Sequence, residues 1–296
     1  MYKMIAIDLD GTLLNSNGEV SEKNKQAIKQ AINKGIEVVL CSGRVRSSIE
    51  NIANEIGATN YLIAGNGAEV YDIKNKKILY QKNIDKQRLL EVAKFCEENS
   101  IFYSVHAENS IITSGIRHNV LVHNSENKNK AIEKRTNINI TENVYEYLKN
   151  SENTGFSKIT ICDGTPVIFK GILEKLRKIK DVEVLEVAHM SNKIVDIENQ
   201  KHELQYYYTE VTAQNVNKWN AINELITKLN INKEEVATIG DNINDKEMLE
   251  NAGLGIVMGN SAPYIREFGK VVVHDNNHDG VAEAVTHYCL TKCGKQ

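Results

Sequence analysis

Two aspartates near the start of the chain, Asp8 and Asp10, follow a short apolar run and stand directly before a glycine. The run at 4–7 predicts a buried strand, and an extended chain places both carboxylates on one side. Gly11 lets the backbone turn sharply at the strand end. Paired carboxylates are costly to ionise without a cation, and Mg²⁺ prefers such oxygens. We expect a magnesium site here, the alternative being a strand end with two solvated acids.

Three further polar groups follow predicted strands or open a predicted helix, namely Ser42-Gly43-Arg44, Asn217-Lys218 and Asp241 through Asp245. In an open parallel sheet, ligands bind beyond the carboxyl ends of the strands. We therefore expect these groups to gather with the two aspartates at one sheet edge. Taken singly, Ser42-Gly43 is typical of a turn, Lys218 of a surface lysine, and Asp241–Asp245 of a helix cap.

Phosphoryl transfer is the chemistry that suits this set, because it requires positioning and charge neutralisation around phosphate oxygens. Asp8 can attack phosphorus to form an aspartyl phosphate. Asp10 can protonate the leaving oxygen and then deprotonate the attacking water. Asp241 and Asp8, together with Asp10 through a nearby backbone carbonyl, can hold Mg²⁺.

The remaining residues of these groups suit phosphate binding. The Ser42 side chain and the Gly43 amide can bind phosphate oxygens, and Lys218 supplies a compensating positive charge. Asn244 can donate its amide to phosphate, and Asp245 can orient Lys218.

The elements that must position these residues follow an α/β pattern. Predicted strands at 4–7, 36–40 and 61–64 alternate with helices at 22–34 and 47–56, which is typical of a parallel sheet. From about residue 84 the alternation is lost, which predicts an inserted α+β domain. We expect a core at 1–83 and 210–296 and an insertion at 84–209. The segment 202–210 is either the returning linker or a last strand.

Composition excludes several classes of partner. The net charge is -3, from 39 acidic and 36 basic residues, and no basic stripe is interleaved with aromatic residues, so we expect no nucleic-acid partner. No apolar run approaches the ~18 residues of a membrane span. Five cysteines without a CxxC pair favour a reduced, cytoplasmic setting. Cys289 and Cys293 are expected to be exposed thiols, and the protein to be a monomer or weak homo-oligomer.

Together these motifs resemble the haloacid dehalogenase superfamily, and more narrowly the Cof-type phosphatases of subfamily IIB. Asp8-Leu9-Asp10-Gly11-Thr12 resembles the first motif and Ser42-Gly43-Arg44 the second. Asn217-Lys218 resembles the third and Gly240 through Asp245 the fourth, while Asn66-Gly67-Ala68 is also typical of the group. Trp219 departs from the pattern, because glycine usually follows the motif-three lysine.

The resemblance implies a Rossmann-like core, a cap of type C2B inserted between the second and third motifs, Mg²⁺, and hydrolysis of small phosphorylated metabolites such as sugar phosphates. It implies phosphate contacts from the Leu9 amide, Ser42, Gly43, Lys218 and Asn244. Two alternatives stay open: a phosphomutase or phosphotransferase on the same fold, and a catalytically silent metabolite-binding protein. The presence of Asp10 favours phosphate esters over the halogenated substrates of true dehalogenases.

Overall fold

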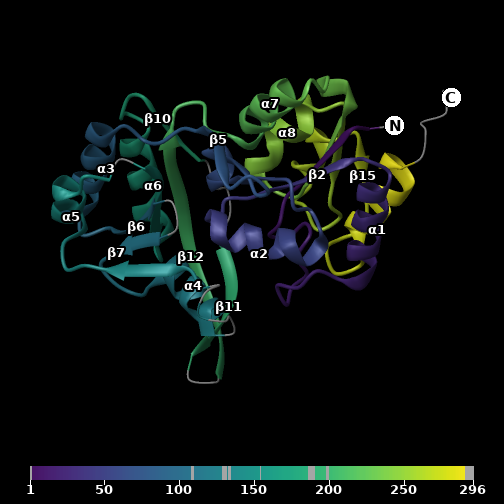
Figure 1. The fold of residues 1–296 in the computed structure, drawn as a ribbon. Coiled ribbons are helices and arrows are strands. Elements are labelled where there is room, and N and C mark those ends of the chain that lie inside the picture. Colours follow the sequence, from purple (N-terminus) through teal and green to yellow (C-terminus); the bar gives the residue numbers. More distant parts are fainter. Residues whose placement is uncertain are drawn as a thin grey trace. The chain divides into compact units, whose positions relative to one another are not determined.

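The computed structural model describes residues 2–107, 110–128, 132, 135–153, 155–185, 191–197 and 200–290. The chain forms two compact units (Figure 1). Unit 1 is drawn from Met1–Gln81 and Asn217–Gln296, and unit 2 from Lys82–Val216. Among the described residues, no helix has the length and apolar character needed to cross a membrane.

Unit 1 is built on an eight-stranded sheet in the order β15-β14-β13-β1-β2-β3-β4-β5. Its strands are β1 (Met4–Ile7), β2 (Glu37–Cys41), β3 (Tyr61–Ala64), β4 (Glu69–Asp72), β5 (Lys77–Gln81), β13 (Val236–Gly240), β14 (Leu254–Val257) and β15 (Val271–Val272). The six strands from β15 to β3 pair in parallel, and β4 and β5 continue the sheet antiparallel. This mixed sheet with a parallel body confirms the predicted α/β class.

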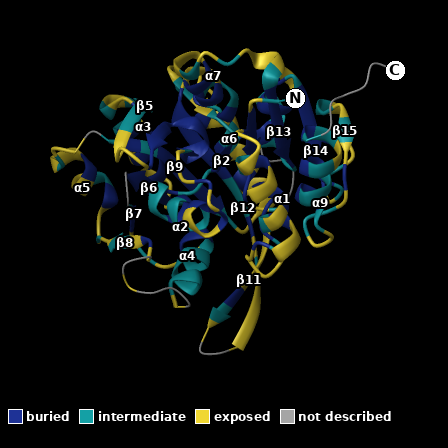
Figure 2. Cartoon of the chain, turned by 45° about the vertical axis from the view of Figure 1, so that its right-hand side comes forward, coloured by how far each residue is buried: buried dark blue, intermediate teal, exposed yellow. Residues whose placement is uncertain are grey.

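The helices of unit 1 bury the two faces of this sheet. They are α1 (Glu22–Asn33), α2 (Arg46–Ile56), α7 (Lys218–Leu229), α8 (Lys246–Asn251) and α9 (Gly280–Glu283). One core cluster joins the sheet to α1, α2 and α9, and another joins its opposite face to α7 and α8. Burial on both faces explains why the parallel strands are continuous apolar runs, drawn dark blue in Figure 2.

The chain end departs from expectation at Cys289. After α9 the helix continues through a π-helical segment, Ala284–Cys289, and Cys289 is fully buried in the core beside α1. The prediction of an exposed thiol at this position is therefore wrong. Cys293 lies outside the described residues.

Unit 2 is an α+β unit around a seven-stranded sheet in the order β10-β12-β9-β6-β7-β8, with β11 paired to β12. Its strands are β6 (Phe102–Ala107), β7 (Ser110–Thr113), β8 (Asn137–Ile140), β9 (Phe156–Asp163), β10 (Val182–Val184), β11 (Ser191–Ile197) and β12 (Gln200–Ala213). Its helices are α3 (Lys86–Glu98), α4 (His118–Lys128), α5 (Val144–Asn150) and α6 (Pro166–Leu176). The segment 202–210, left open between linker and strand, is part of β12.

The two faces of this second sheet differ in chemistry. One face packs apolar residues such as Val105, Ile159 and Val211 against α3, α5 and α6. The alternate positions of the same strands carry polar side chains, among them a buried ion pair in which Lys158 Nζ lies 2.5 Å from Glu210 Oε1. The strict alternation of a strand therefore gives unit 2 one apolar and one polar face.

Buried His106 on the polar face makes the stability of the protein sensitive to acid. It is 3% exposed, its Nε2 lies 3.3 Å from Thr160 Oγ1, and its Nδ1 has no partner among the described residues. Burial, and then the charges of Lys158 and His123, lower its pKa well below 6.5. As the pH falls below about 6.5, the unfolded chain therefore takes up a proton that the folded chain does not.

We expect the unfolding free energy to fall by about 1.4 kcal/mol per pH unit below that point because of this group. Urea denaturation between pH 7 and pH 5, roughly the range in which an unfolded histidine protonates, should show a shallower loss for His106→Gln than for the wild type. His202→Gln, at an exposed position of β12, is the control. If the unfolding free energies of the wild type and His106→Gln fall equally as the pH is lowered, the assignment of this acid sensitivity to His106 is contradicted.

Candidate active site

Asp8 is placed by the central strand of the unit 1 sheet. β1 pairs in parallel with β2 on one side and β13 on the other, and its four residues are fully buried. The ladder continues one step further, since the Asp8 amide donates to Ile239 O at 3.0 Å. The side chain of Asp8 thus leaves the carboxyl end of a rigid strand, where it is 5% exposed.

Lys218 links two of the candidate acids. It is the first residue of α7, whose N-terminus is capped by Asn217, and it is fully buried. Its Nζ lies 2.5 Å from Asp8 Oδ1 and 2.5 Å from Asp245 Oδ1. Burial by itself lowers the pKa of Lys218, but Asp245 and Asp8 outweigh it and the pKa is raised. The ammonium charge is therefore held between two carboxylates.

Three carboxylates converge on this point. One oxygen from each of Asp8, Asp241 and Asp245 lies within 4.8 Å of the others. Burial raises the pKa of Asp8 to about 7 although Lys218 opposes it, and burial with the charges of Asp8 and Asp245 raises the pKa of Asp241. Three carboxylates against one lysine leave excess negative charge, so this oxygen donor set fits a hard divalent cation.

Contacts with Thr12, Gly11 and Asp245 fix the position of Asp241. The Thr12 hydroxyl donates to Asp241 Oδ1 at 3.0 Å. Gly11 has φ +85°, and a Cβ at this residue would lie 2.4 Å from Asp241 Oδ2. The glycine therefore serves both the turn and the approach of the carboxylate. Asp245 Oδ2 accepts hydrogen bonds from the backbone amides of Asp241 and Asn242, at 2.9 and 3.1 Å, and so fixes the loop that carries Asp241.

Asp10 is not one of the three converging carboxylates, but its charge acts on Asp8. Its carboxylate, 45% exposed, is bound by the Arg44 guanidinium, with Nε 2.8 Å from Oδ2 and Nη2 2.7 Å from Oδ1. Such a two-point pair fixes orientation as well as charge. Arg44 follows Ser42-Gly43, so the second predicted motif positions the side chain of the first.

Three of the predicted phosphate ligands, Ser42, Gly43 and Asn244, lie around the turn at Gly65–Gly67. Asn244 Nδ2 donates to Asn66 Oδ1 at 3.1 Å, and the Asn66 amide donates to Ser42 O at 3.0 Å. A Cβ at Gly43 would lie 2.9 Å from Asn66 Oδ1, which shows how closely these segments approach. Leu9 is buried, and its carbonyl accepts the amide of Leu14 at 2.9 Å.

Sequence reasoning gave no role to Thr12 or Asn66. Thr12 stood inside the first motif, and Asn66 in a stretch typical of the family, so a signal was present for both. Asn66 is buried with φ 58°, an unusual backbone conformation for a residue other than glycine. It joins Ser42 to Asn244, which are far apart in sequence, and strained residues of this kind cluster at functional sites.

Comparisons with known proteins agree with this geometry. A family model described as haloacid dehalogenase-like hydrolase matches residues 5–285. The chain therefore belongs to the haloacid dehalogenase family, as the motifs predicted. "Phosphatase YwpJ" of Bacillus subtilis is 29% identical over 96% of this chain and 99% of its own length. "5-Amino-6-(5-phospho-D-ribitylamino)uracil phosphatase YcsE" of the same organism is 30% identical over 97% of this chain and 96% of its own length.

Solved structures support the fold. A haloacid dehalogenase-like hydrolase from B. subtilis superposes with a TM-score of 0.80 at 27% identity, covering 97% of this chain and 99% of its own. The subclass IIB sugar phosphatase BT4131 superposes with a TM-score of 0.75 at 21% identity, covering 97% of this chain and 98% of its own. The second likeness bears on the fold alone.

Proposed function

We propose that the protein is a magnesium-dependent phosphatase of small phosphorylated metabolites. The observation that carries the proposal is the convergence of Asp8, Asp241 and Asp245 around buried Lys218, beside an oriented Asp10. Membership of a hydrolase family, and relatives named as phosphatases over nearly their whole length, support it.

Asp8 and Asp241, with a backbone carbonyl near Asp10, would hold the Mg²⁺ ion. Bound there, the ion supplies positive charge that neutralises the carboxylates and the phosphate oxygens. Asp245 is engaged by Lys218 and by two backbone amides, so its role is to orient the lysine and the Asp241 loop. Calorimetric titration of the wild type with Mg²⁺ should show one site that Asp241→Asn weakens, a readout independent of turnover.

The reaction runs through two carboxylates. A carboxylate oxygen of Asp8 attacks phosphorus, the bond from phosphorus to the ester oxygen breaks, and Asp10 gives that oxygen its proton. A water molecule then attacks the same phosphorus, passes a proton to Asp10, and the bond between Asp8 and phosphorus breaks. The Leu9 amide, Ser42, the Gly43 amide, Lys218 and Asn244 bind the phosphate oxygens in this proposal.

Arg44 holds both oxygens of Asp10 in the structure, a pairing that favours the ionised carboxylate, so in this scheme Asp10 releases one of these bonds and takes up a proton before it acts as the acid. We further propose that unit 2 is the cap of this enzyme, and that the protein acts in the cytoplasm as a monomer or weak homo-oligomer. A phosphomutase or phosphotransferase would use the same core chemistry. A silent binding protein is disfavoured, because Asp8, Asp10, Lys218 and Asp241 are all present.

Phosphate release from a panel of phosphorylated metabolites, including sugar phosphates and a ribitylaminouracil phosphate, tests the proposal. We expect release that requires Mg²⁺ and stops with chelator. A generic aryl phosphate belongs in the panel, because a competent site should cleave it even when the rest of the substrate is not recognised. Transfer of the phosphoryl group to a second sugar rather than to water would indicate the phosphotransferase.

Asp10→Asn is expected to lower kcat by about 10²–10⁴-fold, the usual contribution of general acid–base catalysis. The loss in the first step should be smaller for a nitrophenyl ester than for an alkyl ester, because a good leaving group needs no proton. The variant should therefore show a burst of nitrophenol followed by slow turnover. Equal losses for both esters, without a burst, would reassign the acid.

A further inference from the structure

The segment that follows Asp8 is a compact turn whose inner hydrogen bonds are all local. The amides of Thr12 and Leu14 donate to Leu9 O at 3.2 and 2.9 Å, and the Leu13 amide donates to Asp8 O at 3.2 Å. None of these three bonds uses the carbonyls of Gly11 and Leu14, and both carbonyls accept hydrogen bonds from outside the turn. The side chains that bind these two carbonyls therefore help to fix the position of the turn.

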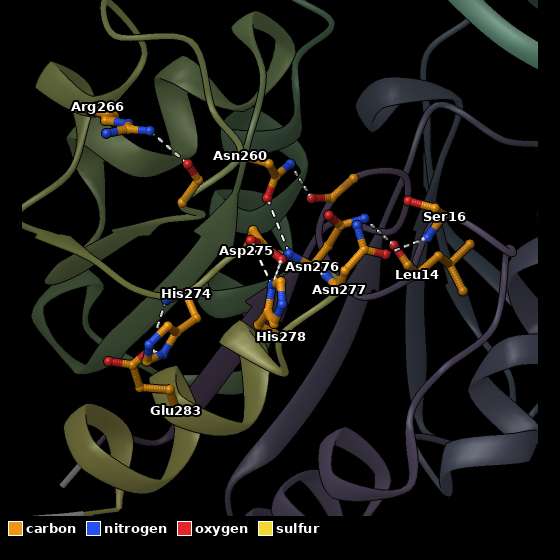
Figure 3. A network of polar contacts seen from close by, with 12 residues as sticks. Leu14, Ser16, Asn260, Arg266, His274, Asp275, Asn276, Asn277, His278 and Glu283 are labelled. Atoms are coloured by element: carbon orange, nitrogen blue, oxygen red, sulfur yellow. Dashed lines mark hydrogen bonds and ion pairs between the residues drawn. The ribbon is translucent and has the colours of Figure 1, made fainter.

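Two asparagines from a distant part of the chain, Asn260 and Asn276, bind these carbonyls (Figure 3). Asn260 Nδ2 donates to Gly11 O at 2.8 Å, and Asn276 Nδ2 donates to Leu14 O at 2.8 Å. The asparagines are also joined to each other, because the Asn276 amide donates to Asn260 Oδ1 at 3.2 Å. Asn260 thus connects the turn that follows Asp10 to a loop about 250 residues further along the chain.

The asparagines are also held by contacts within their own part of the chain. On one side, Arg266 Nη2 donates to Gly259 O at 2.6 Å and the Gly259 amide donates to His274 O at 3.2 Å. His274 is in turn bound to Glu283 of α9, through its amide at 2.8 Å and its Nδ1 at 2.6 Å. In Figure 3, Arg266, His274 and Glu283 lie on one side of Asn260, and Leu14 lies on the other.

On the other side, the loop that carries Asn276 is closed by its own bonds. The Gly280 amide donates to Asp275 O at 3.1 Å, and His278 Nδ1 lies 2.7 Å from Asp275 Oδ1. Both asparagines are therefore held by neighbours in their own segment. They act on the Gly11–Leu14 turn as a fixed support.

We propose that Asn260 is a positioning residue for catalysis, which acts by fixing the peptide between Asp10 and Thr12; the inference rests on the proposed phosphatase function. Gly11 has φ +85° and lies between Asp10, which handles the proton, and Thr12, which holds Asp241. A bond to its carbonyl sets the orientation of both neighbours. Displacing a reacting group by as little as about 1 Å can cost 10²-fold in rate.

Asn260→Ala is the direct test. We expect kcat for an aryl phosphate to fall by about 10–100-fold while KM stays within about threefold, because the phosphate ligands are untouched. Asn260→Asp, which cannot donate to the Gly11 carbonyl, should be at least as slow. The melting temperature should change little, because Asn260 is exposed.

Asn99→Ala is the matched control. Asn99 is an exposed asparagine of unit 2 whose Nδ2 donates to Phe95 O at 2.8 Å, so the variant loses the same kind of bond elsewhere. We expect unchanged kcat for Asn99→Ala. A kcat for Asn260→Ala within twofold of the wild type, or an equal fall in both variants, would overturn the proposal.

Hydrogen exchange of the peptide that carries residues 9–16 separates failure of this proposal from failure of the proposed function. Faster exchange in Asn260→Ala, with the kcat loss, supports the positioning role, and unchanged exchange overturns it. A wild type that releases no phosphate from any ester would overturn the proposed function and the catalytic role of Asn260 together. The exchange result would then still report whether Asn260 holds the turn.

Discussion

Asp8→Asn is expected to abolish turnover, with a loss of about 10⁴-fold or more, while the fold survives. An amide oxygen is a poor nucleophile, so the phosphoryl group has no acceptor. The shape of the side chain is kept, and Lys218 retains Asp245 as its partner. Because Asp8 is one of three converging carboxylates, removing its charge should leave the melting temperature in chelator equal or higher.

The measurement compares Mg²⁺-dependent phosphate release and thermal unfolding of Asp8→Asn with those of the wild type. Asp72→Asn is the control, since Asp72 is also a buried acid at a strand end of unit 1 but is bonded to Asn75. That variant should retain activity. Hydrolysis that persists in Asp8→Asn, with the same metal dependence as the wild type, would contradict the assignment of Asp8 as the nucleophile.

Lys218→Met is expected to damage stability and activity together. The side chains of Lys218 and Asp245 are both fully buried, and breaking a buried pair from one side typically costs about 3–5 kcal/mol of unfolding free energy. The remaining carboxylates of Asp8 and Asp245 would face each other without their shared cation. Losing the charged donor of the proposed phosphate site should also lower kcat by about 10²–10³-fold.

The double variant Lys218→Met with Asp245→Asn separates the two effects of the lysine. Neutralising Asp245 should restore part of the stability lost in Lys218→Met, whereas activity should stay low. Lys228→Met, at an exposed position of the same helix, should change neither. Urea denaturation in the presence of chelator measures these stabilities. If Lys218→Met is as stable as the wild type, the pair of Lys218 and Asp245 does not contribute to the unfolding free energy.

Much of the unit 1 site could be predicted from the sequence, because its residues follow buried strands. The short apolar runs before Asp8, Ser42 and Asp241 are typical of strands of a parallel sheet covered on both faces, and such strands end at one edge. The order of the sheet then brings β1, β2 and β13 side by side. Lys218 was predicted at a helix start, where it is found.

Side-chain pairing could not be predicted in the same way. The contact between Arg44 and Asp10 depends on rotamers, and sequence spacing carries no information on these. The hydrogen bonds of Asn66, Asn260 and Asn276 join loops whose approach only the folded backbone determines. Sequence reasoning therefore placed the strand ends correctly but missed the residues that tie the loops together.

Unit 2 was harder to predict, since its strands, apart from the parallel pair β7 and β8, pair antiparallel and its sheet has one polar face. The segment that forms β12 carries three consecutive tyrosines among mostly polar residues and has no clear apolar face, so strand and linker could not be distinguished. At the chain end, polar composition predicted an exposed Cys289. The π-helical segment instead turns Cys289 toward the core. Nothing in the sequence pattern predicts this change of helical period.

The central claim is that Asp8 carries the phosphoryl group during turnover. Acid quenching during a single turnover of an aryl phosphate, followed by peptic digestion at acid pH, which preserves an acyl phosphate, and mass spectrometry, tests it most directly. We expect one phosphoryl group on the peptide that contains Asp8, present in the wild type and absent in Asp8→Asn. Consumption of the ester with no labelled peptide in Asp10→Asn, the variant in which the intermediate should accumulate, or a label on another peptide, would contradict it.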